Sequence, residues 1–247
     1  MNKYGLSFIS NEDLFNHVKE TIQKYKFIIN LKDFNKNLID PIKLTFDFKV
    51  YGKTLNEIIE SEIIRQIDKS NNNHIGYFHQ NIFKYIAKDW KVPSKGFDIV
   101  NDKKKIYVEM KNKHNTMNSK SSSATYMMMQ DKIINDNKAI CMLVEVIAKK
   151  SQNIKWKVSI NGISSSHKNI RRVSIDKFYE YVTGDKMAFK NLVQILPTVI
   201  DDVLSKMSKG MLKITVIDEL EKISDDILKS IYLLSFKSYE GFDKLTF

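Results

Sequence analysis

The chain has 247 residues, 43% of them hydrophobic and 28% charged, which argues against wholesale disorder and allows one large core or one core with an appended lobe. Lys and Arg outnumber Asp and Glu by 40 to 29, so the formal net charge is +11. A surplus of this size favours a polyanionic partner such as nucleic acid, because each neutralised phosphate releases counterions. A generally lysine-rich proteome would produce the same excess, so charge alone leaves both interpretations open.

Cys141 is the single cysteine and lies in an apolar run, so no intramolecular disulfide can form. This fits a reducing cytoplasm, with Cys141 as a core thiol and not a catalytic one. No stretch approaches 18 uninterrupted apolar residues, and the first residues lack the apolar segment of a signal peptide. We therefore expect a soluble, cytoplasmic protein with no membrane partner.

The first third of the chain is predicted to be mainly helical. Apolar periodicity indicates helices at 10–28, 54–69 and 75–89, with Ser10 or Asn11 and Thr54 as N-caps. The Asn71-Asn-Asn73 run is expected to end the second helix. Residues 30–53 are expected to be irregular, with a turn at Asp40-Pro41 and an alternating piece at 44–50.

β-Strands are predicted in the middle of the chain, at 96–100, 104–111, 139–148 and 156–160. A serine-rich loop at 112–123 and a helix at 124–135 separate the second strand from the third. Residues 161–172 are expected to form a polar loop.

The remainder is predicted to be helical, at 175–182, 186–196, 198–207 and 219–235, with a break at Pro197 and a short strand at 212–217. We find no repeat and no linker. We therefore expect a single domain over 1–247, with a catalytic core at about 54–160 and a helical C-terminal part at about 173–247.

A group of charged residues lies on the first two predicted strands. Side chains alternate between the faces of a strand, so Glu109 and Lys111 share one face while Val108 and Met110 share the other. Asp98, on the preceding strand, reaches the same region if the two strands pair as a hairpin. Neighbouring carboxylates repel, and a hard divalent cation such as Mg²⁺ relieves that repulsion. An edge hairpin with solvent-facing charges is the alternative.

Glu62 is a further candidate carboxylate. At 100° per residue it falls within the apolar arc of the 54–69 helix, so it points toward the core and needs a partner. That partner is either a metal site or an ion pair with Arg65 or Gln66.

The pattern Asp98…Glu109-Met-Lys111 resembles the PD-(D/E)XK nuclease motif. Three longer segments, at 51–62, 73–80 and 109–116, are similar to type II restriction endonucleases that cut GGNCC or GGWCC, and 176–185 is also typical of restriction enzymes. The resemblance covers roughly residues 5–205. Phe97 stands where the motif has proline, which many of these nucleases also lack.

The resemblance implies an α/β PD-(D/E)XK core, in which helices flank a central mixed sheet, with helical additions at both termini. It implies Mg²⁺ dependence, Asp98 and Glu109 as metal ligands, and Lys111 as the catalytic lysine. It also implies a homodimer that cuts both strands of double-stranded DNA, with a companion methyltransferase protecting the host.

DNA contacts are predicted in three places. Guanine is read most often by arginine, and the 164–172 segment holds two of the three arginines. The candidates there are His167, Lys168, Arg171 and Arg172, unless the segment is a polar surface loop or its arginines bind acidic C-terminal helices. The residues after the catalytic strand are candidates for phosphate contact, namely Asn112, Lys113, His114 and Asn115. Gln130, on the 124–135 helix, is also expected near the site.

Two rival functions remain open from the residues alone. One is another nuclease with the same core, either a repair enzyme or a methyl-dependent one. The other is a DNA-binding protein without catalysis, which the Asp98, Glu109 and Lys111 set disfavours. The chain has no phosphate-binding Gly-x-x-x-x-Gly-Lys loop and no cysteine near His74 and His79, so nucleotide hydrolysis and a zinc site are not expected.

Overall fold

The computed structural model describes residues 3–207, 212–238 and 246. The chain divides into two compact units, one formed by Met1–Ile22 and Ile75–Met207 and the other by Gln23–His74 and Ser208–Phe247. Helix α4 (Leu55–Asn81) contributes residues to both units. No helix within the described residues is long and apolar enough to cross a membrane.

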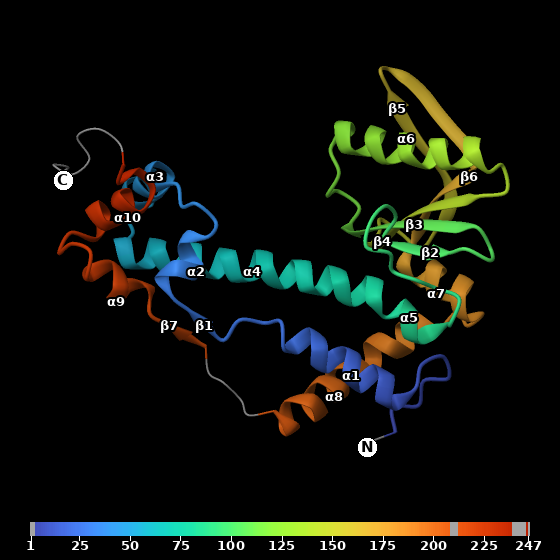
Figure 1. The fold of residues 1–247 in the computed structure, drawn as a ribbon, viewed down its shortest axis with the longest axis horizontal. Helices are drawn as coiled ribbons and strands as arrows, with labels where there is room; N and C mark the ends of the chain where they lie inside the picture. The colour runs from blue at the N-terminus through green and yellow to red at the C-terminus, as the bar shows by residue number, and fades with distance from the viewer. Residues whose placement is uncertain (1–2, 208–211, 239–245, 247) are drawn as a thin grey trace. The chain divides into compact units, whose positions relative to one another are not determined.

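The first unit contains a five-stranded mixed sheet with strand order β2-β3-β4-β6-β5 (Figure 1). The strands are β2 (Ile99–Asn101), β3 (Ile106–Lys113), β4 (Ile140–Ile147), β5 (Asn153–Ile160) and β6 (Ile163–Ser174). The three central strands, β3, β4 and β6, run parallel, and each outer strand pairs antiparallel with its neighbour. The predicted α/β class with a mixed sheet and flanking helices is confirmed.

Helices cover both faces of this sheet. The helix α6 (Ser119–Asn135) packs on one face, where Tyr126 and Met129 meet Cys141 and Leu143 of β4. The opposite face packs against helices α1 (Asn11–Ile22), α5 (Phe83–Ile86), α7 (Ile175–Thr183) and α8 (Ala188–Lys206). Because Val108 and Met110 belong to this second core, the alternating residues Glu109 and Lys111 lie on the α6 face.

In the second unit the described helices and strands are short helices, the first part of α4 and one two-stranded parallel pair. Its elements are β1 (Ile28–Ile29), α2 (Leu31–Asn35), α3 (Pro41–Tyr51), the first part of α4, β7 (Lys213–Ile214), α9 (Val216–Glu221) and α10 (Ile227–Phe236). Fully buried residues of its core include Phe34 of α2, Leu44 of α3, Ile59 and Ile63 of α4, and Ile231 of α10.

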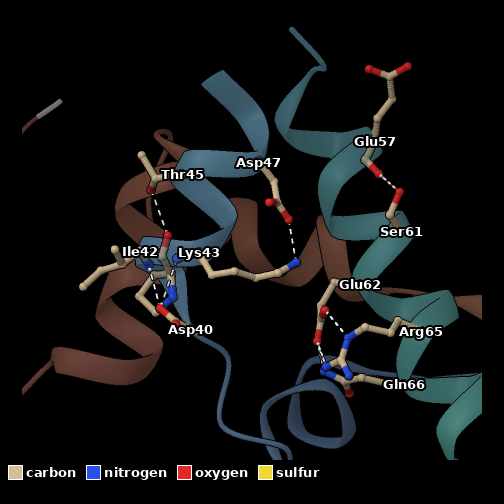
Figure 2. Close-up of polar contacts among 11 residues, drawn as sticks. Asp40, Ile42, Lys43, Thr45, Asp47, Glu57, Ser61, Glu62, Arg65 and Gln66 are labelled. Atoms are coloured by element: carbon tan, nitrogen blue, oxygen red, sulfur yellow. Dashed lines mark hydrogen bonds and ion pairs between the residues drawn. The ribbon is translucent and has the colours of Figure 1, made fainter. Parts of the chain in front are cut away.

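The prediction that residues 30–53 are irregular was wrong, because most of the segment is helical. Asp40 caps α3 by accepting hydrogen bonds from the backbone N–H groups of Ile42 and Lys43 at 3.0 and 3.1 Å (Figure 2). Pro41 occupies the first helical turn, where its missing N–H is harmless, and Gly52 ends the helix with φ of 60°. What the sequence suggested as alternation at 44–50 is a helix with Leu44 buried and Phe46 exposed.

Two predicted helix breaks are absent from the described structure. Asn71–Asn73 lie inside α4, where the Asn72 amide donates to Asp68 at 2.9 Å and buried Phe78 anchors the following turns. Pro197 lies inside α8 and is exposed, while Leu192 and Val199 bury the helix on either side of it. Tertiary packing thus outweighs the local penalty of both breakers.

The predicted loop at 161–172 is also wrong, because its residues form strand β6. Asn161 and Gly162 both have positive φ, 50° and 82°, and form the two-residue turn between β5 and β6. Asn-Gly is the preferred sequence for such a hairpin turn. The last predicted helix, 219–235, is instead two helices, because Asp226 caps α10 and so begins a new one.

Candidate active site

The β2–β3 hairpin brings Asp98 and Glu109 face to face. Ile99 pairs with Val108, so Asp98 continues the same register opposite Glu109. The Asp98 carboxylate accepts a hydrogen bond from the backbone N–H of Met110 at 2.7 Å, which fixes its orientation against β3. The predicted hairpin therefore forms and brings the two acids together.

Lys111 completes the group from the same face of β3. Its ammonium donates to the Glu109 carboxylate at 2.6 Å, and both side chains are partly buried, with 30% and 15% exposed. Burial raises the pKa of Asp98, and the neighbouring Glu109 charge raises it further, against the opposing effects of the Met110 N–H and Lys111. The charged form of Asp98 is therefore disfavoured unless more positive charge arrives.

These residues fit a hard divalent cation with an incomplete protein shell. Among the described residues, no group of three or more His, Cys, Asp or Glu side chains is placed to hold a metal ion. Two carboxylates that lack compensating positive charge suit the coordination preference of Mg²⁺, which keeps several waters and takes substrate phosphate as a further ligand. Asp98 and Glu109 are the residues that would supply the protein ligands.

A second ion pair, which the sequence analysis missed, lies on the same face. Glu145 of β4 is only 1% exposed, and Arg172 of β6 donates to its Oε1 atom through Nε at 3.0 Å and through Nη2. The same Nη2 donates to the carbonyl of His114 at 3.2 Å. Glu145 was visible in the sequence as the one charged residue of the apolar 139–148 run, and this signal could have identified it.

The residues predicted to read bases are strand residues with defined partners. Arg172 is bound to Glu145, while Arg171 donates to the side chain and backbone of Asn153 at 2.9 and 2.6 Å. His167 accepts a hydrogen bond from the N–H of Asn169, and Lys168 is exposed. In the described part of the chain neither arginine binds the acidic C-terminal helices, and base reading by these residues stays a prediction.

The candidate segment 112–115 begins with the last two residues of β3, Asn112 and Lys113, and continues beyond the end of the strand. The amide of Asn112 lies against α4, since a Cβ added to Gly76 would stand 3.6 Å from it. The backbone of His114 is held from two sides, because its N–H donates to Ile147 at 3.0 Å and its carbonyl accepts from Arg172. The side chains of Lys113 and Asn115 are exposed. Gln130 is half-buried on α6, the helix that covers this face.

Glu62 belongs to the second unit, whereas Asp98, Glu109 and Lys111 belong to the first. Its side chain is 7% exposed and accepts hydrogen bonds from Arg65 at 2.5 and 2.7 Å and from Gln66 at 3.0 Å (Figure 2). Burial would raise the pKa of Glu62, but these hydrogen bonds outweigh it and lower the pKa. The contacts of Glu62 in the structure are therefore those of the alternative partner, Arg65 with Gln66.

Comparison with known proteins identifies the family of the chain. The family model of the Eco47II restriction endonuclease matches residues 6–205. The type II restriction enzyme Sau96I of Staphylococcus aureus is 32% identical over 213 residues, which cover 81% of each chain. The type II restriction enzyme Eco47II of Escherichia coli is 31% identical over 214 residues, which cover 81% of this chain and 89% of that enzyme. The chain therefore belongs to the Eco47II restriction endonuclease family and is a type II restriction enzyme.

Proposed function

We propose that the protein is a Mg²⁺-dependent endonuclease with a PD-(D/E)XK core that cuts both strands of double-stranded DNA at a short palindrome. The palindrome is GGNCC or its narrower form GGWCC. The observation that carries this proposal is the β2–β3 register, which sets Asp98 opposite Glu109 with Lys111 on the same face. Family membership supports site-specific cleavage, and the three side chains supply its chemistry.

In this mechanism Asp98 and Glu109 are the protein ligands of the cation. The bound cation would supply Lewis-acid stabilisation of the negative charge that builds on the scissile phosphate. The Met110 N–H holds Asp98 in place, so this ligand is oriented before substrate arrives. The Lys111 ammonium orients the attacking water and stabilises charge on the phosphate oxygens. Water adds to phosphorus and the bond to the 3′ oxygen breaks, which leaves a 5′-phosphate and a 3′-hydroxyl.

The remaining assignments follow from the same proposal. The chain acts as one restriction-endonuclease domain, and a two-fold DNA site calls for a homodimer. A companion methyltransferase protects the host copy of the site. Glu62 is an accessory catalytic carboxylate, and the DNA-contacting residues are Asn112, Lys113, His114, Asn115, Gln130, His167, Lys168, Arg171 and Arg172. The +11 net charge supports a polyanionic substrate.

A plasmid digest tests this function. With Mg²⁺ we expect discrete fragments whose mapped ends lie at one short palindrome, and with EDTA we expect none. Lys111→Ala removes the ammonium beside Glu109 and is expected to lower the cleavage rate by about 100- to 1,000-fold while DNA binding persists.

Lys105→Ala is the matched control, because Lys105 lies at the other end of the same hairpin and pairs with Asp136. It should cleave like the unmodified protein. Wild-type cleavage by Lys111→Ala, or equal cleavage in EDTA, would show that the proposed site is wrong.

A further inference from the structure

Glu145 is a buried carboxylate of which only one oxygen is used. Its Oε1 atom binds Arg172, whereas its Oε2 atom is buried and has no hydrogen-bond partner among the described residues. A buried acceptor without a donor costs free energy, so such an atom calls for an explanation.

The sheet register places Glu145 beside Lys111 on the neighbouring strand. Lys111 of β3 and Glu145 of β4 are directly paired Cα partners on parallel strands. Partners in register project to the same face and stand about 5 Å apart. Within the described part of the chain, however, the ion-pair partner of Lys111 is Glu109 and not Glu145.

The proposed function creates a need that Glu145 can meet. Glu109 is the ion-pair partner of Lys111 in the structure. In the proposed function it is also a ligand of the cation. When a carboxylate binds a cation, the positive charge of the cation offsets its negative charge, and its attraction for a neighbouring ammonium becomes weaker. Lys111 then needs another acceptor.

We propose that Glu145 is the positioning residue for Lys111, and that its free Oε2 accepts the ammonium when Glu109 serves as a metal ligand. This rests on the proposed function. Arg172 holds the other oxygen and so fixes the rotamer of Glu145, and it ties the pair to the His114 carbonyl behind the site. Lys111 thereby has one acceptor before the metal binds and another afterwards.

The first test is the Glu145→Gln variant at saturating Mg²⁺. The amide keeps the shape of the side chain but removes the charge, so we expect kcat to fall about 10- to 100-fold while KM for DNA stays within about twofold. Asp136→Asn is the matched control, because Asp136 follows α6 just before β4 begins and forms an ion pair with Lys105, which directly precedes β3, whereas Lys111 lies near the opposite end of β3. It should leave kcat unchanged.

A second readout reports on Lys111 without any cleavage. Reductive methylation of Lys111 is followed by mass spectrometry with and without Mg²⁺, and no DNA is added. In the unmodified protein Lys111 should stay protected when Mg²⁺ is added, whereas in Glu145→Gln its labelling should rise about 10-fold, since the second acceptor is missing.

Arg172→Gln separates positioning from simple structural support. If Glu145 only keeps Arg172 in place, both variants should lower kcat equally and leave the labelling of Lys111 unaffected by Mg²⁺, and the proposal is overturned. Cleavage by Glu145→Gln at the wild-type rate also overturns the proposed role of Glu145. If Lys111→Ala does not cleave in the same experiment, the proposal that the protein is a nuclease still stands. Full activity of Lys111→Ala would instead remove the proposed function itself.

Discussion

Three acidic and two basic side chains lie on or next to the β-strands that carry the candidate site. Asp98, Glu109 and Glu145 are acidic, and Lys111 and Arg172 are basic, so the group has one excess negative charge when all five are ionised. Each basic residue is hydrogen-bonded to one acid, which leaves Asp98 without a hydrogen-bonded cationic partner among the residues that the structure describes. The excess charge therefore falls where the proposed cation would bind.

The raised pKa of Asp98 makes stability depend on pH in a specific direction. Burial and the Glu109 charge hold the pKa of Asp98 above its ordinary value of 3.8, so the folded state binds this proton more tightly than the unfolded state does. The stabilisation is fully present below pH 3.8 and is lost as pH rises through the folded pKa. Asp98→Asn mimics the protonated form and keeps an oxygen to accept the Met110 N–H.

Thermal unfolding in EDTA measures this effect. At neutral pH the Asp98→Asn variant should melt at a higher temperature than the unmodified protein, and near pH 3.5 the two should converge. Adding Mg²⁺ at neutral pH should stabilise the unmodified protein more than the variant. A variant that melts lower at neutral pH in EDTA would contradict the sign of the shift.

At the scale of elements, capping and turn residues set several boundaries. Ser10 caps α1, because its hydroxyl accepts from the Asp13 N–H, and Thr54 and Glu57 form a reciprocal capping box at the start of α4. Both caps are readable from sequence, and both were predicted. The Asp40 cap and the Asn161-Gly162 turn also depend only on neighbouring residues. The sequence nevertheless did not predict α3 or β6, because residues 44–50 alternate like a strand and residues 164–172 are polar like a loop.

The cap of α3 is tested by Asp40→Ala. The change leaves the Ile42 and Lys43 N–H groups without their acceptor and should lower the free energy of unfolding by about 1 kcal/mol, as measured by urea denaturation. Asp47→Ala in the same helix loses only a surface ion pair with Lys43, which contributes about 0.5 kcal/mol or less (Figure 2). Equal losses in the two variants would argue against the cap.

At the scale of the whole molecule, the excess positive charge governs how the enzyme meets DNA. Lys and Arg exceed Asp and Glu by 11, and many of the lysines are exposed, including Lys113 at the end of β3 and Lys168 of β6. Such a surface attracts DNA of any sequence and brings the site to its target. Contacts with phosphates position the protein, whereas contacts with base edges select the sequence.

Salt dependence checks this electrostatic role. With Lys111→Ala to prevent cleavage, DNA affinity should fall about 1,000- to 100,000-fold between 50 and 200 mM salt if six to ten phosphates are contacted. Fluorescence anisotropy with duplexes that contain or lack the palindrome gives the two affinities. Both should weaken together while the ratio between them is kept, and affinity that does not depend on salt would contradict the role.

The sequence by itself determined the hairpin of the candidate site, because period-two alternation and turn residues act between neighbours in the chain. It also determined the buried strand β4, which appears as a continuous apolar run. Residue patterns within about ten positions are enough for such features.

Only the tertiary structure decided which distant residues meet. Glu145 and Arg172 are 27 residues apart and become partners because β6 pairs with β4, and no local pattern states that strand order. Packing is also the reason why α4 continues past Asn71–Asn73 and α8 continues past Pro197. The free energy gained by burying Phe78 and Val199 exceeds the local free-energy cost of these residues in a helix. The group of Asp98, Glu109 and Lys111 follows from the local hairpin pattern, whereas the pair of Glu145 and Arg172 depends on the order of the strands in the sheet.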